Sequence, residues 1–256
     1  MKNIIAYTFV TAFLSLSIIS CKKESGTVNT AQLNEYMPLA VGKYIHYRLD
    51  SMRFVEFGQK DTTISYDAKD VVDAEFVDNT GRPSFLVVRY LRNINSTNES
   101  DYSPILTYVV TPTRESVEVV EDNLRFLKMR LPVTEGFNWH GNSFLPSTPY
   151  YELYQFSNDE DMNVWDYTYE NVNQPMLVND NIYDSTITIL QAADSSNVPI
   201  DFPEALAYRN YWTESYAKNI GLIYKEVVMW EYQPPNSGNP GFRSGFGLTM
   251  SIIDHN

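Results

Sequence analysis

Short runs of β-branched and aromatic residues, separated by turn residues, recur along this 256-residue chain and restrict the folds open to it. Such runs are typical of strands joined by turns. After residue 20, no long stretch has the apolar spacing of an amphipathic helix. The runs predict strands at residues 43–55, 62–76, 84–91, 116–121, 124–131, 163–170, 183–191, 211–217, 222–232 and 247–253.

Several of these runs alternate between apolar and polar residues. Leu127, Met129 and Leu131, for example, alternate with Lys128 and Arg130. Period-two alternation places one set on the core and the other in water, so Lys128 and Arg130 are expected to face solvent. We therefore expect an all-β fold, mostly antiparallel, built as a curved sheet, an open barrel or a sandwich, with at most one or two short helices.

Two connecting segments lack this pattern. Residues 93–100 are polar and are expected to form a loop. Residues 192–207 are irregular, and a short helix is expected around residues 204–206. Residues 35–256 are expected to form a single β-rich domain, a normal size for such folds.

The first twenty residues have the features of a secretory signal. Lys2 gives a basic start, an apolar run follows, and Ser20 precedes Cys21, the only cysteine in the chain. The run from Ile18 to Cys21 resembles a bacterial lipobox. This resemblance implies cleavage before Cys21 and a lipid on its sulfur. The residues that follow are polar, so the lipidated cysteine and a flexible tether are expected over residues 21–34. The alternatives are a membrane-spanning anchor and a core helix.

The formal net charge of −13 argues against a nucleic-acid partner, because an acidic chain has no general attraction to phosphates. The expected partners are the membrane, through the lipid anchor, and an envelope protein, a glycan or a lipid. By the sorting rule of well-studied lipoproteins, Lys22 after the cysteine favours the outer membrane of the cell envelope. The periplasmic and the surface leaflet both stay open.

Five segments carry a family resemblance: residues 36–44, 49–51, 131–142, 216–226 and 244–247. Together they resemble an uncharacterised family of cell-envelope lipoproteins from Bacteroidota-type bacteria, over nearly the whole mature chain. The resemblance implies an envelope location and assigns no catalytic residue. The shorter segment 217–222 is similar to one in envelope proteins of the half-barrel, lipoprotein-carrier type.

Aromatic residues make up 14% of the chain and gather in its second half. They can fill a β core, or they can form a platform for a glycan or line an apolar cavity. The candidate ligand-binding residues are Trp139, Trp165, Tyr167, Tyr169 and Trp212.

A calcium site is a further hypothesis, and no other cofactor is expected. Asp159, Asp161, Asn163 and Glu170 stand at positions one, three, five and twelve of a calcium-binding loop pattern, where oxygen ligands are required. Val164 occupies the position that this loop reserves for glycine. An acidic hairpin turn is the alternative.

Two further patterns have structural alternatives. Ser51, Thr62 and Ser185 each follow an aspartate and resemble the O-glycosylation signal of Bacteroidota-type bacteria, although such sequences are also ordinary in strands and turns. A Pro-x-x-x-Gly segment also precedes both His46 and His140 at the same spacing. Either the chain is internally duplicated, or the same turn chemistry precedes two strands.

The sequence contains no convergent catalytic set. We therefore expect an envelope-anchored lipoprotein that acts as a non-enzymatic binding or interaction module. The first alternative is a carrier of a lipid or other hydrophobic ligand in a curved β-sheet. The second is a glycan-active hydrolase, which would need two carboxyl groups facing each other across a cleft.

Overall fold

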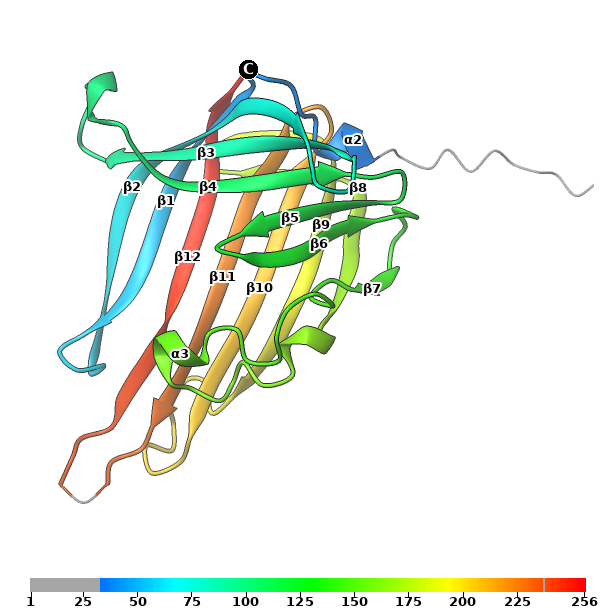
Figure 1. Cartoon of the computed structure of the whole chain (residues 1–256). Coiled ribbons are helices and arrows are strands. Elements are labelled where there is room, and N and C mark those ends of the chain that lie inside the picture. The colour runs from blue at the N-terminus through cyan, green and yellow to red at the C-terminus, as the bar shows by residue number, and fades with distance from the viewer. Residues whose placement is uncertain (1–32, 237) are drawn as a thin grey trace, which may run out of the picture. The chain divides into compact units, whose positions relative to one another are not determined.

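Twelve antiparallel strands form one sheet in the computed structural model, which describes residues 33–236 and 238–256 (Figure 1). The strand order is β6-β5-β4-β3-β2-β1-β12-β11-β10-β9-β8-β7, so β1–β12 is the one pairing between strands distant in sequence. The strands are β1 (Tyr44–Val55), β2 (Lys60–Val77), β3 (Pro83–Asn93), β4 (Ser103–Pro112), β5 (Ser116–Glu121), β6 (Leu124–Arg130), β7 (Asn138–His140), β8 (Asp166–Val178), β9 (Asn181–Ser196), β10 (Ala207–Ala217), β11 (Gly221–Gln233) and β12 (Phe242–His255).

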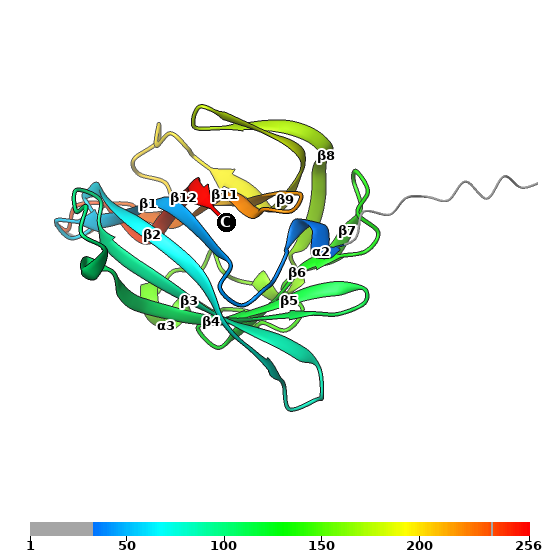
Figure 2. The same cartoon turned by 90° about the horizontal axis from the view of Figure 1, so that it is seen from above.

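The two edge strands, β6 and β7, curl toward each other, so that the sheet is a nearly closed barrel (Figure 2). The Leu127 amide donates a hydrogen bond to the Gly141 carbonyl at 2.7 Å, and Trp139 Nε1 donates to the Leu127 carbonyl at 2.7 Å. Tyr169 Oη accepts from the Arg130 amide and donates to the Arg130 carbonyl. These contacts satisfy backbone groups that an open edge would leave unpaired.

Short helices complete the fold. Within the described ranges the α-helices are α2 (Leu33–Tyr36) and α3 (Tyr151–Tyr154), and the 3₁₀ turns are Glu99–Asp101 and Met162–Val164. The predicted all-β class is therefore confirmed. No helix in this part of the chain has the length and apolarity needed to span a membrane. Cys21 and the rest of the expected signal lie outside the described residues.

The predicted strands all overlap observed ones, and residues 94–98 form the expected loop. Two strands were not predicted: β4, which has Pro104 near its start and Pro112 at its end, and β7, which has three residues. The expected helix around residues 204–206 was wrong. Those residues form a turn, and β9 continues to Ser196 because residues 192–196 pair with β10.

Lys128 was wrongly expected to face solvent. The residues of β6 opposite Val117 and Glu118 are Met129 and Leu127, so Lys128 is an extra residue in a β-bulge. A bulge interrupts the two-residue alternation of a strand. Lys128 is only 5% exposed and pairs with Glu214 of β10, whereas Arg130 is exposed as expected.

The connection between β7 and β8, residues 141–165, packs inside the barrel at the end where α3 lies, and we call it the plug (Figure 1). Its Leu145, Phe156 and Met162 are buried against wall residues that include Phe126, Trp212, Val227 and Met229. At its start, a Cβ on Gly141 would lie 2.3 Å from Cδ2 of Tyr167, so only glycine permits this close approach.

The other end of the barrel is covered by α2 and the residues after it. Leu33 and Tyr36 are buried, and the Asn219 amide between β10 and β11 donates to the Glu35 carbonyl at 2.6 Å. Leu33 belongs to the segment that the sequence assigned to the tether, yet it packs in the core.

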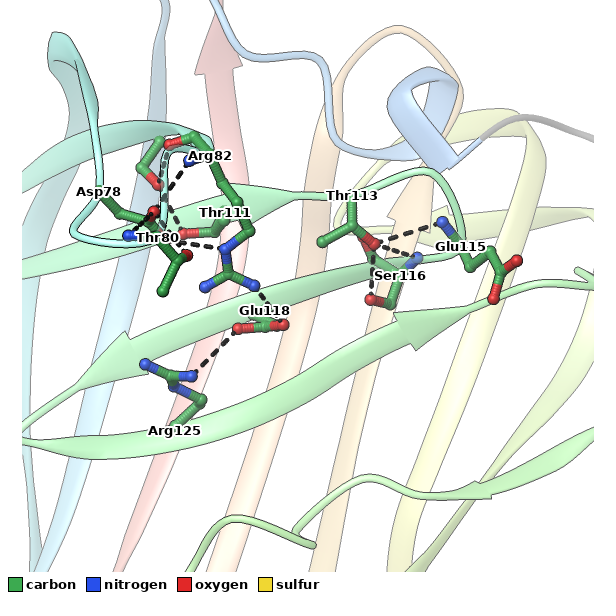
Figure 3. Close-up of polar contacts among 10 residues, drawn as sticks. Asp78, Thr80, Arg82, Thr111, Thr113, Glu115, Ser116, Glu118 and Arg125 are labelled. Atoms are coloured by element: carbon green, nitrogen blue, oxygen red, sulfur yellow. Dashed lines mark hydrogen bonds and ion pairs between the residues drawn. The ribbon is translucent and has the colours of Figure 1, made fainter.

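A polar network lies on the outer face of β3 to β6 (Figure 3). The Arg82 guanidinium contacts Asp78 and Glu118, each at 2.8 Å, and Arg125 lies 3.6 Å from Glu118. Backbone and side-chain donors from Thr80 and Arg82 hold the pKa of Asp78 below its usual value. The network connects the turn after β2 to β5 and β6.

Candidate functional site

A pocket of about 560 Å³ lies between the plug and the inner face of β9, β10 and β11; we call it the plug pocket. Side chains two residues apart on a strand face the same side of the sheet. In β10, Trp212 and Glu214 face the barrel interior, so Asn210 faces the interior as well. Its lining includes Ser157, Asn158, Glu160 and Trp165 from the plug, Asp166 from β8, Gln191 and Asp194 from β9, Tyr208 and Asn210 from β10, and Glu231 from β11.

β9 has a bulge at Gln191. Trp212 pairs with Ala192 and Thr213 with Leu190, so Gln191 is the extra residue between them. Gln191 follows the buried Ile187 and Ile189 at two-residue spacing, and the bulge then brings Asp194 opposite the inward-facing Asn210. Gln191 is 2% exposed, and neither its amide nitrogen nor its amide oxygen has a hydrogen-bond partner. A buried polar group without a partner is unusual and requires an explanation.

Hydrogen bonds between the plug and the wall fix the shape of the pocket. Asn158 Nδ2 donates to Asn210 Oδ1 at 2.9 Å and to the Trp230 carbonyl at 3.0 Å, and Asn210 Nδ2 donates back to the Asn158 carbonyl. The Ser157 amide and hydroxyl both donate to Glu231 Oε2. The pocket is therefore preformed, and Asn158 Oδ1 is left buried without a partner.

The plug pocket is acidic. Glu160, Asp166, Asp194 and Glu231 line it, and its lining includes no lysine or arginine. Asp166 Oδ1 lies 2.6 Å from His140 Nδ1. Asp194 accepts a hydrogen bond from the Tyr208 hydroxyl at 3.0 Å, which raises the pKa of Tyr208.

A second polar feature, the charge centre, lies deeper in the barrel. Arg89 donates two hydrogen bonds to Asp70, each at 2.6 Å. Lys128 Nζ lies 2.7 Å and Lys225 Nζ 3.3 Å from Glu214 Oε1. The six members are three cations and three acids: Asp70, Arg89, Glu121, Lys128, Glu214 and Lys225.

The members of the charge centre shift one another's pKa values. Burial raises the pKa of Glu214, but Lys128 and Lys225 outweigh burial and hold it at about 2. Burial and the nearby Lys225 lower the pKa of Lys128, despite Glu214. For Lys225 the attraction of Glu214 and Glu121 exceeds the effect of burial, and its pKa is raised. The three cations and three acids of the centre balance in formal charge.

Two pockets adjoin the charge centre, because the lining of each includes Glu121, Lys128 and Lys225. The one toward α2 has a volume of about 100 Å³ and mostly apolar walls. The one beside α3, which we call the α3 pocket, has a volume of about 400 Å³. Tyr150, Leu153, Tyr154, Trp212 and Phe246 form its apolar lining, and Trp212 Nε1 is buried without a partner.

The structure separates the five candidate ligand-binding residues. Trp139, Tyr167 and Tyr169 are buried and pack together near the β6–β7 junction, with ring centroids 5.8 and 4.6 Å from that of Trp139. Trp165 is half-buried in the plug pocket, and the Trp212 ring lies edge-on to it with centroids 5.9 Å apart. Trp165 therefore lines the plug pocket, and Trp212 lines the α3 pocket.

The calcium pattern is not assembled into a cluster. Asp159 is buried, and its Oδ2 accepts a hydrogen bond from the Tyr150 amide at 2.8 Å. Asp161 and Asn163 lie at the 3₁₀ turn before β8, and Glu170 lies within β8. Among the described residues, no group of three or more His, Cys, Asp or Glu could hold a metal ion.

The remaining predicted positions lie on strands. Ser51 is on β1, Thr62 on β2 and Ser185 on β9, and of these Thr62 is exposed. His46 contacts Asp67 and Tyr102, whereas His140 contacts Asp166. Their Pro-x-x-x-Gly segments precede β1 and β7, the first strands of two six-strand halves, but duplication stays a prediction.

Sequence reasoning missed Gln191, Asp194, Asn210 and Glu231. A usable signal was present for Gln191, because it follows Ile187 and Ile189 at positions that are otherwise apolar. No protein-family model and no curated protein matches the sequence. The function of the protein is therefore inferred from the geometry of its pockets.

Proposed function

We propose that this protein is an outer-membrane lipoprotein of the cell envelope that binds a glycan in the plug pocket without converting it. The resemblance of residues 18–21 to a lipobox supports the location. The observation that carries the binding role is Gln191, a buried amide without a partner that lines a preformed pocket.

The lining of the pocket suits a sugar. The half-buried Trp165 offers a ring on which the apolar face of a sugar ring can stack. Amide and carboxylate oxygens of Gln191, Asp194 and Glu231 can accept hydrogen bonds from hydroxyl groups. Sites of this kind combine an aromatic surface with a few placed polar groups.

Replacement of Gln191 by Leu is expected to increase the stability of the protein and to weaken its binding of the glycan. Because an unpartnered buried polar group is destabilising by about 1–3 kcal/mol, Gln191→Leu should raise the free energy of unfolding. The same change removes a ligand contact and should weaken glycan binding about tenfold. Urea denaturation measures the first effect, and titration calorimetry with a glycan identified on an oligosaccharide array measures the second.

The control replaces aromatic residues inside and outside the pocket. Trp165→Ala should weaken binding at least as much as Gln191→Leu. Tyr151→Ala removes an exposed ring of α3 that does not line the pocket, and should leave binding unchanged. A Gln191→Leu variant that is less stable and binds as tightly as the wild type would contradict the proposal.

A hydrophobic-ligand carrier is the second candidate function, and the α3 pocket favours it. Its apolar walls end at Lys128 and Lys225, so it would hold a short amphiphile with its polar end at the charge centre. Native mass spectrometry of the detergent-free protein should then show an added acyl species. Leu153→Glu, at an exposed position of the pocket lining, should remove that species. An unmodified mass for the wild type would exclude this candidate.

A further inference from the structure

The plug pocket has more hydrogen-bond acceptors than donors. Gln191 Oε1 and Asn158 Oδ1 are buried acceptors that no donor reaches, and Gln191 Nε2 is the matching free donor. The Asn158 orientation is fixed, because its nitrogen faces the Trp230 carbonyl and Asn210 Oδ1. Gln191 Nε2 carries two donor hydrogens, so the excess of acceptors comes from the carboxylates of the lining. A ligand that satisfies the whole pocket must supply mainly donors.

The pocket also carries uncompensated negative charge. Glu160, Asp194 and Glu231 take part in none of the ion pairs formed by the described residues. Asp194 accepts a hydrogen bond from Tyr208, and Glu231 accepts from Ser157 and Gln233, but these neutral donors leave the carboxylate charge in place. Clustered charge of one sign in a recess raises the local concentration of the opposite charge.

We propose that the ligand is a glycan with free, protonated amino groups, that is, a basic amino sugar. An ammonium group donates three hydrogen bonds and accepts none, which matches the excess of acceptors. Its charge complements Glu160, Asp194 and Glu231, and it is also attracted to the ring face of Trp165. This inference rests on the proposed function, because it names the class of glycan for the same pocket.

The test compares two probes that differ in one group. Titration calorimetry of the full-length protein uses the tetramer of β-1,4-linked glucosamine and the tetramer of N-acetylglucosamine, at slightly acidic pH. The acetyl group removes the charge and keeps the sugar ring. The glucosamine tetramer should bind at least about tenfold more tightly, and added salt should reduce this preference because it screens charge.

Variants of the pocket carboxylates show whether the preference for the glucosamine tetramer depends on their charge. The double variant Asp194→Asn, Glu160→Gln keeps the side-chain shapes and removes two charges, so the ratio between the affinities for the two tetramers should fall severalfold. Glu152→Gln on α3, outside the pocket, is the matched control.

The outcomes distinguish this inference from the proposed function. Equal binding of both tetramers, or a preference that the double variant retains, overturns the amine inference and leaves a glycan site. Binding of neither tetramer overturns the inference, and an oligosaccharide array without any hit overturns the proposed function as well. Shortened oligomers after incubation would replace the non-converting role with a hydrolase.

Discussion

Replacement of Glu214 by Gln is expected to lower the free energy of unfolding by about 3–5 kcal/mol at pH 7, the usual result of breaking a buried ion pair on one side. Glu214 is 2% exposed and is the carboxylate between Lys128 and Lys225. Without it, three buried cations face two acids, and Lys128 has no carboxylate within hydrogen-bond distance. Urea denaturation measures the loss.

The companion variant Lys128→Met should be less damaging, because Glu214 then still has Lys225 at 3.3 Å. Glu204→Gln is the control: this glutamate is exposed in the turn before β10, and its loss should change stability by less than about 0.5 kcal/mol. A Glu214→Gln variant as stable as the Glu204→Gln control would show that the charge centre does not depend on this carboxylate.

The same centre predicts how stability depends on pH. The folded pKa of Glu214 is about 2, below its ordinary value of 4.5, so the unfolded chain binds the proton more readily. The stabilisation from Glu214 is therefore complete above pH 4.5 and is lost as the pH falls toward 2. Glu121 adds to this trend, because Lys225 and Arg89 also lower its pKa against the effect of burial. The Glu214→Gln variant should lose part of this acid dependence, which denaturation between the two pH values would show.

The alternation of residues predicted the strands well, but it could not predict β-bulges. A strand with strict two-residue alternation would have placed Lys128 in water, and the bulge in β6 turns it inward instead. In β9 the bulge at Gln191 brings Asp194 to the inner face, where strict alternation from Ile189 would have placed Ala193. Bulges are set by the partner strand and the curvature of the sheet, and a single sequence does not contain this information.

The candidate site was predictable only in part, for a related reason. Trp165 was identified because it belongs to the aromatic residues that gather in the second half of the chain. Gln191, Asn210 and Glu231 come from three different strands and meet through the register of the sheet. Asn158 reaches them from the plug, whose path inside the barrel has no counterpart in the local sequence pattern. Pairing between segments distant in sequence determines which residues meet in such a site. Local propensity determines where the strands lie along the chain.

Trp139→Ala is expected to destabilise the protein by about 3–5 kcal/mol, the usual cost of truncating a large buried aromatic residue. Trp139 is 4% exposed, packs on Tyr167 and Tyr169, and donates from Nε1 to the Leu127 carbonyl across the β6–β7 junction. Trp139→Phe keeps most of the packing and loses this hydrogen bond, so it should cost about 1 kcal/mol plus a smaller packing loss.

Hydrogen exchange shows whether the loss is local to this junction. The Leu127 amide donates to the Gly141 carbonyl, and Gly141 is the first residue of the plug. Opening of the junction in Trp139→Ala should therefore speed exchange at Leu127 and also weaken ligand binding in the plug pocket, although Trp139 does not line it. Unchanged protection at Leu127 would mean that β6 and β7 are held together without Trp139. Faster exchange with unchanged binding would mean that the plug keeps its place through Asn158, Ser157 and the wall strands alone.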